Sequence, residues 1–184
     1  VSVGSGASTP PGTVSAETYC SSIPNPIVNG STSGAIIENV TLIGDNNNID
    51  NNTGGVGDFY EPYTASMCAD ITEGQPYTVD VTLNGISGGT GAQDLSGAKV
   101  YIDYNINGDF SDPGEEVAII PYRTPSTQGL PESITFTVPS TGVYGPTAMR
   151  VVSQSLTTAN VNDIGPCDVP TGGVQPWYGA TEDY

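Results

Sequence analysis

Short runs of alternating apolar and polar residues recur along this chain, separated by residues typical of turns. The run TVDVTL (78–83) places Val79, Val81 and Leu83 on one face, and SITFTV (133–138) alternates in the same way. This period of two is typical of half-buried strands, and no segment has a clear helical period. We therefore expect an all-β fold.

Six segments have the composition of strands. They are 35–43, 76–84, 98–105, 116–122, 132–138 and 148–154. Six or seven short strands in about 165 residues indicate an antiparallel β-sandwich of the Ig-like or jelly-roll-like kind. The Asn- and Gly-rich stretches 44–55 and 85–97 are expected to be polar loops.

The start of the chain differs from the rest. Residues 1–16 are small and uncharged and include Pro10-Pro11-Gly12, so they do not bury enough apolar area to fold alone. We expect an extended N-terminal arm over 1–16 and a sandwich over 17–184. Val1 and Val3 nevertheless have a β-propensity that a flexible linker does not need.

Acidic residues dominate the charge. Twenty Asp and Glu residues stand against three Lys and Arg, which gives a net charge of −17. Such a surface repels phosphate backbones and anionic membranes, which argues against nucleic-acid and polybasic membrane contacts. No apolar run approaches the roughly 20 residues of a membrane span.

The stretch DYNINGDFSDPGEE (103–116) has the spacing of a calcium loop. Oxygen-bearing side chains occupy positions 1, 3, 5 and 7, and Gly108 at position 6 permits the tight bend. Gly114 stands where a position-12 glutamate is usual, so a neighbouring carboxylate must substitute. We expect Ca²⁺ as a cofactor, with these candidate ligands: Asp103, Asn105, Asn107, Asp109, Asp112, Glu115 and Glu116. The alternative is a hairpin turn in which Asp and Asn bond their own backbone.

The chain contains no histidine. Its absence removes the commonest general base, the Ser–His and Cys–His nucleophile pairs and most zinc sites. Paired carboxylates can hydrolyse glycosides, but acidic residues are so numerous that a chance pair is expected. We therefore expect that the protein is not an enzyme.

Two further sets of residues suggest contacts with glycans. Aromatic side chains in Gly- and Pro-flanked segments can stack on sugar rings, although closing the ends of the core is the favoured alternative; they are Tyr60, Tyr63, Trp177 and Tyr178. Three positions match the N-glycosylation pattern, for which chance matches are expected: Asn29, Asn39 and Asn51.

Three cysteines leave the disulfide pattern open. Cys20, Cys68 and Cys167 allow three pairings, and the odd one is either a spare thiol or a bond to another molecule.

Eight segments from Tyr19 onward follow one another in a recognisable order. They are YCSS (19–22), IIENVTL (36–42), NNTGG with DFYEPYTAS (51–66), GQPYTVDVT (74–82), VYIDYNINGDFSDPGEE (100–116), FTVPSTGVYGPTAMRV (136–151), Cys167 and YGATEDY (178–184). Together they resemble the GEVED domain, a β-sandwich module of secreted and surface proteins.

The resemblance implies a non-catalytic accessory, adhesion or surface module. It also implies a Cys20–Cys167 disulfide, which leaves Cys68 as a buried thiol or as a link to a neighbouring chain. The chain departs from the family at Ala180, where the family has Glu, and at Asn107, where its loops usually have Asp. Any ligand role at these two positions is therefore weakened.

The last residues, WYGATEDY (177–184), have the pattern of a strand that begins and does not finish. In the family this motif continues as an alternating stretch, and the first residues of the chain, VSVG (1–4), have the pattern of that continuation. Three arrangements fit: one period of a tandem array, an arm folded onto its own sandwich, or an arm inserted into the next molecule. A flexible arm is the plain alternative.

We expect an extracellular, secreted or cell-surface structural protein whose partners are copies of itself. Its subunits would assemble head to tail into a fibre by strand addition, with Val1, Val3 and Tyr184 at the junction and calcium stiffening the 103–116 loop. The alternative is a carbohydrate-binding or adhesion module of a secreted bacterial protein.

Overall fold

A computed structural model describes most of the chain. The described residues are 1–4, 19–22, 35–54, 60–85, 95–123, 127, 129–141, 143–156, 161–167 and 179–184. They form an all-β sandwich, as predicted, with one 3₁₀ turn, η2 (Val161–Asp163). Within these residues no helix has the length and apolar character to cross a membrane.

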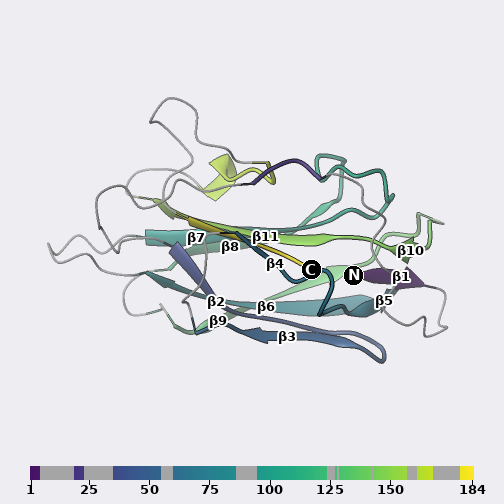
Figure 1. Ribbon diagram of the computed structural model, residues 1–184, viewed down its shortest axis with the longest axis horizontal. Helices are drawn as coiled ribbons and strands as arrows, with labels where there is room; N and C mark the ends of the chain where they lie inside the picture. The colour runs from purple at the N-terminus through teal and green to yellow at the C-terminus, as the bar shows by residue number, and fades with distance from the viewer. Residues whose placement is uncertain are drawn as a thin grey trace, which may run out of the picture.

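One layer is a five-stranded sheet in the order β4-β12-β11-β7-β8 (Figure 1). Its strands are β4 (Tyr60–Pro62), β7 (Leu95–Ile102), β8 (Glu116–Arg123), β11 (Met149–Leu156) and β12 (Gly179–Asp183). Neighbours are antiparallel except β12 and β4, which run parallel. The sheet is therefore mixed, whereas the sequence predicted antiparallel pairing throughout.

The facing layer is a four-stranded antiparallel sheet in the order β3-β2-β6-β9. Its strands are β2 (Ala35–Ile43), β3 (Asn48–Asn52), β6 (Pro76–Gly85) and β9 (Pro131–Thr137). Val79, Val81 and Leu83 are fully buried between the layers, as their alternation predicted. Each such side chain contributes about 1.5–3 kcal/mol of transfer free energy.

A small third sheet closes one end of the sandwich in the order β10-β1-β5. It consists of β1 (Ser2–Gly4), β5 (Asp70–Thr72) and β10 (Gly145–Pro146). Strand β1 runs antiparallel to β10 and parallel to β5, and Val1 beside it is buried. The start of the chain is therefore part of the sandwich, and residues 5–16 of the predicted arm lie outside the described residues.

The outer face of the five-stranded sheet is also covered. A second apolar cluster lies there, under η2 and beside residues 19–22: Tyr101, Phe110, Ala148, Val152 and Ile164. Because both faces of β11 are buried, charged residues on it require partners inside the protein.

Most predicted strands are confirmed, but the predicted loop 44–55 contains β3. Ile49 and Asn51 alternate as its buried residues, and the Asn51 amide donates to the Tyr184 hydroxyl at 2.8 Å. A satisfied hydrogen bond allows an asparagine to occupy a buried strand position, which composition alone does not indicate. The strands β4, β5 and β10 were not predicted because two or three residues carry no measurable period.

Candidate functional site

The predicted calcium loop connects β7 to β8, and its first residue is fully buried. The Asp103 carboxylate accepts hydrogen bonds from the backbone N–H groups of Asn107 (3.2 Å) and Gly108 (2.9 Å). It also accepts one from the Tyr19 hydroxyl at 2.8 Å. Gly108 has a φ of 85°, which the tight bend requires. Both a calcium loop and a hairpin turn begin with such bonds.

Four more of the predicted ligands lie close together in this loop. Asn105 and Asn107 each donate a side-chain amide hydrogen to Asp112 Oδ2 at 2.7 Å. Glu115 is buried and accepts a hydrogen bond from the backbone N–H of the residue after Asp103. Burial, and then the nearby Asp103 carboxylate, raises the pKa of Glu115 to about 7. The loop thus concentrates acceptor oxygens with little positive charge to balance them.

The other two predicted ligands are directed elsewhere. The Ser111 hydroxyl, followed by the backbone N–H groups of Ser111 and Phe110, lowers the pKa of Asp109 by hydrogen bonding to its carboxylate. Glu116 forms an ion pair with Lys99 at 2.8 Å. Spacing alone included both residues because it does not indicate where a side chain points.

The loop has the donor chemistry that calcium prefers, in a form stabilised by its own hydrogen bonds. Carboxylate and amide oxygens from five residues are the usual calcium ligands. However, across the described residues, which include this whole loop, no group of three or more His, Cys, Asp or Glu side chains is arranged to hold a metal ion. A cation would have to replace the bonds that Asn105 and Asn107 donate to Asp112. Calcium therefore stays a prediction.

The same loop contacts the segment that pairs with β1. The Thr147 hydroxyl donates to the Asp103 carbonyl, and the Ile106 side chain lies 3.3 Å from where a Cβ on Gly145 would be. Ile106 has a φ of 56°, which is a rare conformation for a β-branched residue. The conformation of the loop is therefore coupled to the position of β10.

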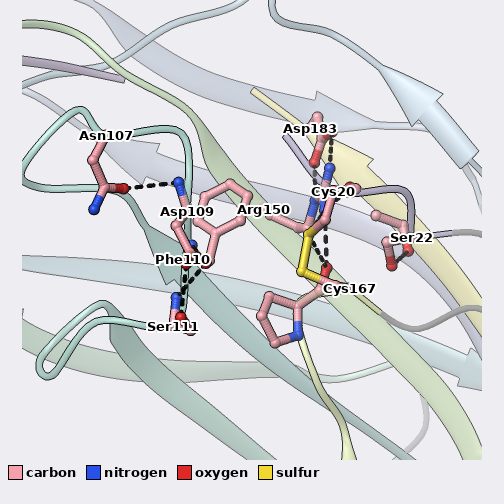
Figure 2. Close-up of a disulfide and its surroundings, with 11 residues drawn as sticks. Cys20, Ser22, Asn107, Asp109, Phe110, Ser111, Arg150, Cys167 and Asp183 are labelled. Atoms are coloured by element: carbon pink, nitrogen blue, oxygen red, sulfur yellow. Dashed lines mark hydrogen bonds and ion pairs between the residues drawn. A yellow bond between two sulfur atoms is a disulfide. The ribbon is translucent and has the colours of Figure 1, made fainter. Parts of the chain in front are cut away.

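Arg150 on β11 is the centre of a buried polar cluster (Figure 2). Its Nε and Nη2 donate to the two carboxylate oxygens of Asp183, each at 2.7 Å. Its Nη1 donates to the carbonyls of Cys20 (2.8 Å) and Pro166 (2.9 Å), and the guanidinium lies 5.0 Å from the centroid of the Phe110 ring. Bidentate pairing and two carbonyl acceptors satisfy a charge that is 2% exposed.

The terminal motif on β12 is also structural. Its carboxylates face opposite ways: Asp183 bonds Arg150, whereas Glu182 accepts a hydrogen bond from the Tyr184 hydroxyl inside the sandwich. Gly179 is required because a Cβ there would collide with the Ser153 carbonyl of the neighbouring strand. All six residues from 179 to 184 are buried.

Residues 97–184, which include this motif and its antiparallel partner β11, match the family model described as the GEVED domain. The resemblance to the GEVED family is confirmed over this part of the chain. No curated protein and no solved structure matches the chain. In this region, Asp183 is the buried partner of Arg150, and Glu182 and Tyr184 are buried in the sandwich, so the Glu-Asp-Tyr end of the motif does not form a solvent-facing site.

The disulfide that the GEVED resemblance implied is confirmed. Cys20 bonds Cys167 and joins residues 19–22 to residues 161–167 next to Arg150 (Figure 2). Cys68 is a free, half-buried thiol between β4 and β5. An intermolecular bond at Cys68 stays a prediction.

The two ends of the chain meet in one strand line. Backbone hydrogen bonds join Tyr184 to Met149 in both directions (2.8 and 2.9 Å), and join Val1 to Thr147 in both directions (2.7 Å each). The Val1 nitrogen lies 3.5 Å from the Tyr184 carbonyl oxygen. β12 pairs with β11, and β1 pairs with β10, which directly precedes β11 in the chain. Strand β1 therefore continues the direction of β12 along residues 145–156, and only Ala148 lies opposite the junction (Figure 1). We call the place that β1 fills between β10 and β5 the strand slot.

The aromatic residues proposed to contact glycans have structural roles where they are described. Tyr60 is 39% exposed, but its hydroxyl donates to Asp183 at 2.9 Å. The Tyr63 ring stacks on Tyr184 with a centroid distance of 5.5 Å. The remaining two candidates lie outside the described residues: Trp177 and Tyr178.

The glycosylation candidates are also constrained by the fold. Asn51 is 5% exposed and its amide nitrogen donates to Tyr184, so a glycan there would require β3 to open. The Asn39 side-chain oxygen accepts a hydrogen bond from Thr41 at 3.0 Å. Asn29 lies outside the described residues.

Sequence reasoning missed the role of Arg150. The sequence did contain a signal for this role, namely the small number of basic residues. The chain has a net charge of −17 and only three basic residues, and two of them, Lys99 and Arg150, lie within predicted strands. Both are buried and both pair with carboxylates. In so acidic a chain, a basic residue inside a strand is a signal for a buried ion pair.

Proposed function

We propose that this protein is an extracellular structural subunit that joins copies of itself head to tail, when β1 of one molecule fills the strand slot of the next. The observation that carries the proposal is the shared strand line of β12 and β1. A slot that accepts a separate strand through backbone hydrogen bonds on both sides supports donation from its own chain or from a second copy. Repeated without closure, donation between copies makes a filament.

Chain length supports exchange between molecules. Fourteen residues, 5–18, separate β1 from Tyr19, and a chain of that length spans up to about 50 Å. The Cys20–Cys167 disulfide also supports an oxidising, extracellular compartment. The proposal needs no catalytic group.

Engineered cysteines can show which copy supplies β1. Ser2 pairs with Pro146 at a position without backbone hydrogen bonds, where opposite Cα atoms are about 4.5 Å apart and a disulfide fits. We expect Ser2→Cys with Pro146→Cys, in a Cys68→Ser background, to give a covalent ladder on a non-reducing gel at high protein concentration. Ser2→Cys with Asp50→Cys is the matched control and should give no ladder.

Two outcomes would contradict assembly by exchange. One is a cross-linked species that stays monomeric at every concentration. The other is filaments in negative-stain micrographs that persist after deletion of residues 1–16, since those filaments would not depend on β1.

Calcium is the second part of the proposal, because the 103–116 loop contacts β10 on one side of the strand slot. Calcium at about 100 times its dissociation constant should stabilise the folded protein by about 2.7 kcal/mol, measured as a rise in the thermal midpoint. Asp103→Asn should abolish the rise, whereas Glu116→Gln should retain it because Glu116 pairs with Lys99. An equal rise in both variants would place any bound calcium elsewhere.

A further inference from the structure

Two carboxylates face each other across the parallel strands β12 and β4. Glu182 is the register partner of Glu61, so both side chains leave the same face of the sheet. Glu182 is 2% exposed and points into the sandwich on the side of Tyr184. Like charges directly opposite each other on neighbouring strands are destabilising.

In the part of the chain that the structure describes, no cationic side chain faces this pair, and the ammonium group of Val1 lies beyond Tyr184, 3.5 Å from its carbonyl oxygen. From β3 the neighbour is Asn51, from the segment after β4 it is Tyr63, and from the end of β12 it is Tyr184. Across β11 the register partner of Glu182 is Val151, which is uncharged.

The described charges nearby are engaged in other contacts. On β2 the titratable side chain is Glu38, which accepts a hydrogen bond from Asn84. The two cations whose side chains the structure describes are occupied, since Arg150 bonds Asp183 on the opposite face and Lys99 bonds Glu116.

We propose that Glu182 and Glu61 form an acid-stabilised carboxyl pair: Glu182 is held neutral in the folded protein and holds the edge strand β4 against β12, and its ionisation loosens that edge. The proposal is independent of fibre assembly. The edge has few other bonds to hold it, since β4 has three residues, and the Tyr63 N–H donates to the Asp183 carbonyl at 2.6 Å just beyond it. Tyr184 also lies next to Val1, so loosening would reach the strand slot.

The direction of the pH dependence follows from burial. Burial raises the pKa of Glu182 to about 7 in the folded protein, against 4.5 for the free group; the hydrogen bond from Tyr184 partly opposes this shift, and the charge of Glu61 adds to it. At Glu182 the folded state therefore binds more protons than the unfolded state between these values, and the stability that Glu182 contributes falls as pH rises from about 4.5 to 7. Below the lower value this contribution is fully present. Burial lowers the pKa of the Val1 ammonium from 8.0 to about 5, which acts in the opposite direction, so only the difference from Glu182→Gln isolates the carboxyl.

The test compares Glu182→Gln with the unmodified protein in the presence of a chelator. Between pH 5 and pH 8, the unfolding constant of the unmodified protein should rise more than that of Glu182→Gln, by a factor on the order of 10–100. Hydrogen exchange at the Tyr63 amide, corrected for its intrinsic rate, should accelerate with pH in the unmodified protein only. Asp50→Asn, which removes an exposed carboxylate from β3, should keep the unmodified profile.

Two results would overturn the proposal. One is a Glu182→Gln profile parallel to that of the unmodified protein. The other concerns the variant Asp103→Asn, in which the predicted calcium loop is disabled. If calcium in place of the chelator fully restored the stability of this variant at pH 8, Glu182 and Glu61 would be a cation site. If Glu182→Gln does not fold, Glu61→Gln provides the measurement, because removing the facing charge should shift the transition to lower pH.

Discussion

Arg150→Met should destabilise the protein by about 3–5 kcal/mol, the usual loss when one partner of a buried ion pair is removed. The substitution keeps most of the apolar volume but leaves the Asp183 carboxylate, with 7% of its side chain exposed, without its cation. It also removes the donor to the carbonyls of Cys20 and Pro166. Urea denaturation followed by circular dichroism measures the loss.

A second ion pair in the same sheet is the control. Glu116 is 40% exposed in its pair with Lys99, so Glu116→Gln should cost less than about 1 kcal/mol. The double variant Arg150→Met with Asp183→Leu should recover part of the loss, because no charge is then left unpaired. Equal losses in Arg150→Met and Glu116→Gln would show that Arg150 does not hold the cluster together.

Replacing both disulfide cysteines, Cys20→Ser with Cys167→Ser, should cost about 5 kcal/mol. The two residues are 147 positions apart, and a cross-link that closes so long a loop removes much of the conformational entropy of the unfolded chain. The denaturation midpoint of the double variant should match that of the reduced protein.

The free cysteine is the control for this prediction. Cys68 makes no disulfide, so Cys68→Ser should change stability by less than about 1 kcal/mol. A double Cys20/Cys167 variant that is as stable as Cys68→Ser would show that the bridge adds nothing to a sandwich already held by its sheets.

The fold could be predicted from the sequence where strands are long enough to show a period. β6 and β9 alternate clearly, because one face of each strand is buried and the other faces solvent. β3 could not be predicted, since its Asn51 is buried only by virtue of a hydrogen bond to a residue 133 positions away. Such long-range partners leave no local pattern in the sequence.

The candidate site was predictable in part, for a similar reason. Spacing identified the loop that holds Asp103 and Glu115, but it could not show that Glu116 points to Lys99 on the adjacent strand. Sequence resemblance indicated the Cys20–Cys167 bridge, which spacing left open. The two ends of the sequence together have the pattern of one strand, and in the structure Val1 lies next to Tyr184.

The position of the disulfide limits how far the protein can stretch. A force applied at Val1 and Tyr184 can extend only the 19 residues before Cys20 and the 17 after Cys167. The disulfide transmits the force directly between the two cysteines, so the residues between them are not extended. The extensible residues correspond to about 120 Å of slack, against about 600 Å for the whole chain. The module would therefore behave as a short, stiff tether under tension, and reduction of one bond would turn it into a long, compliant one.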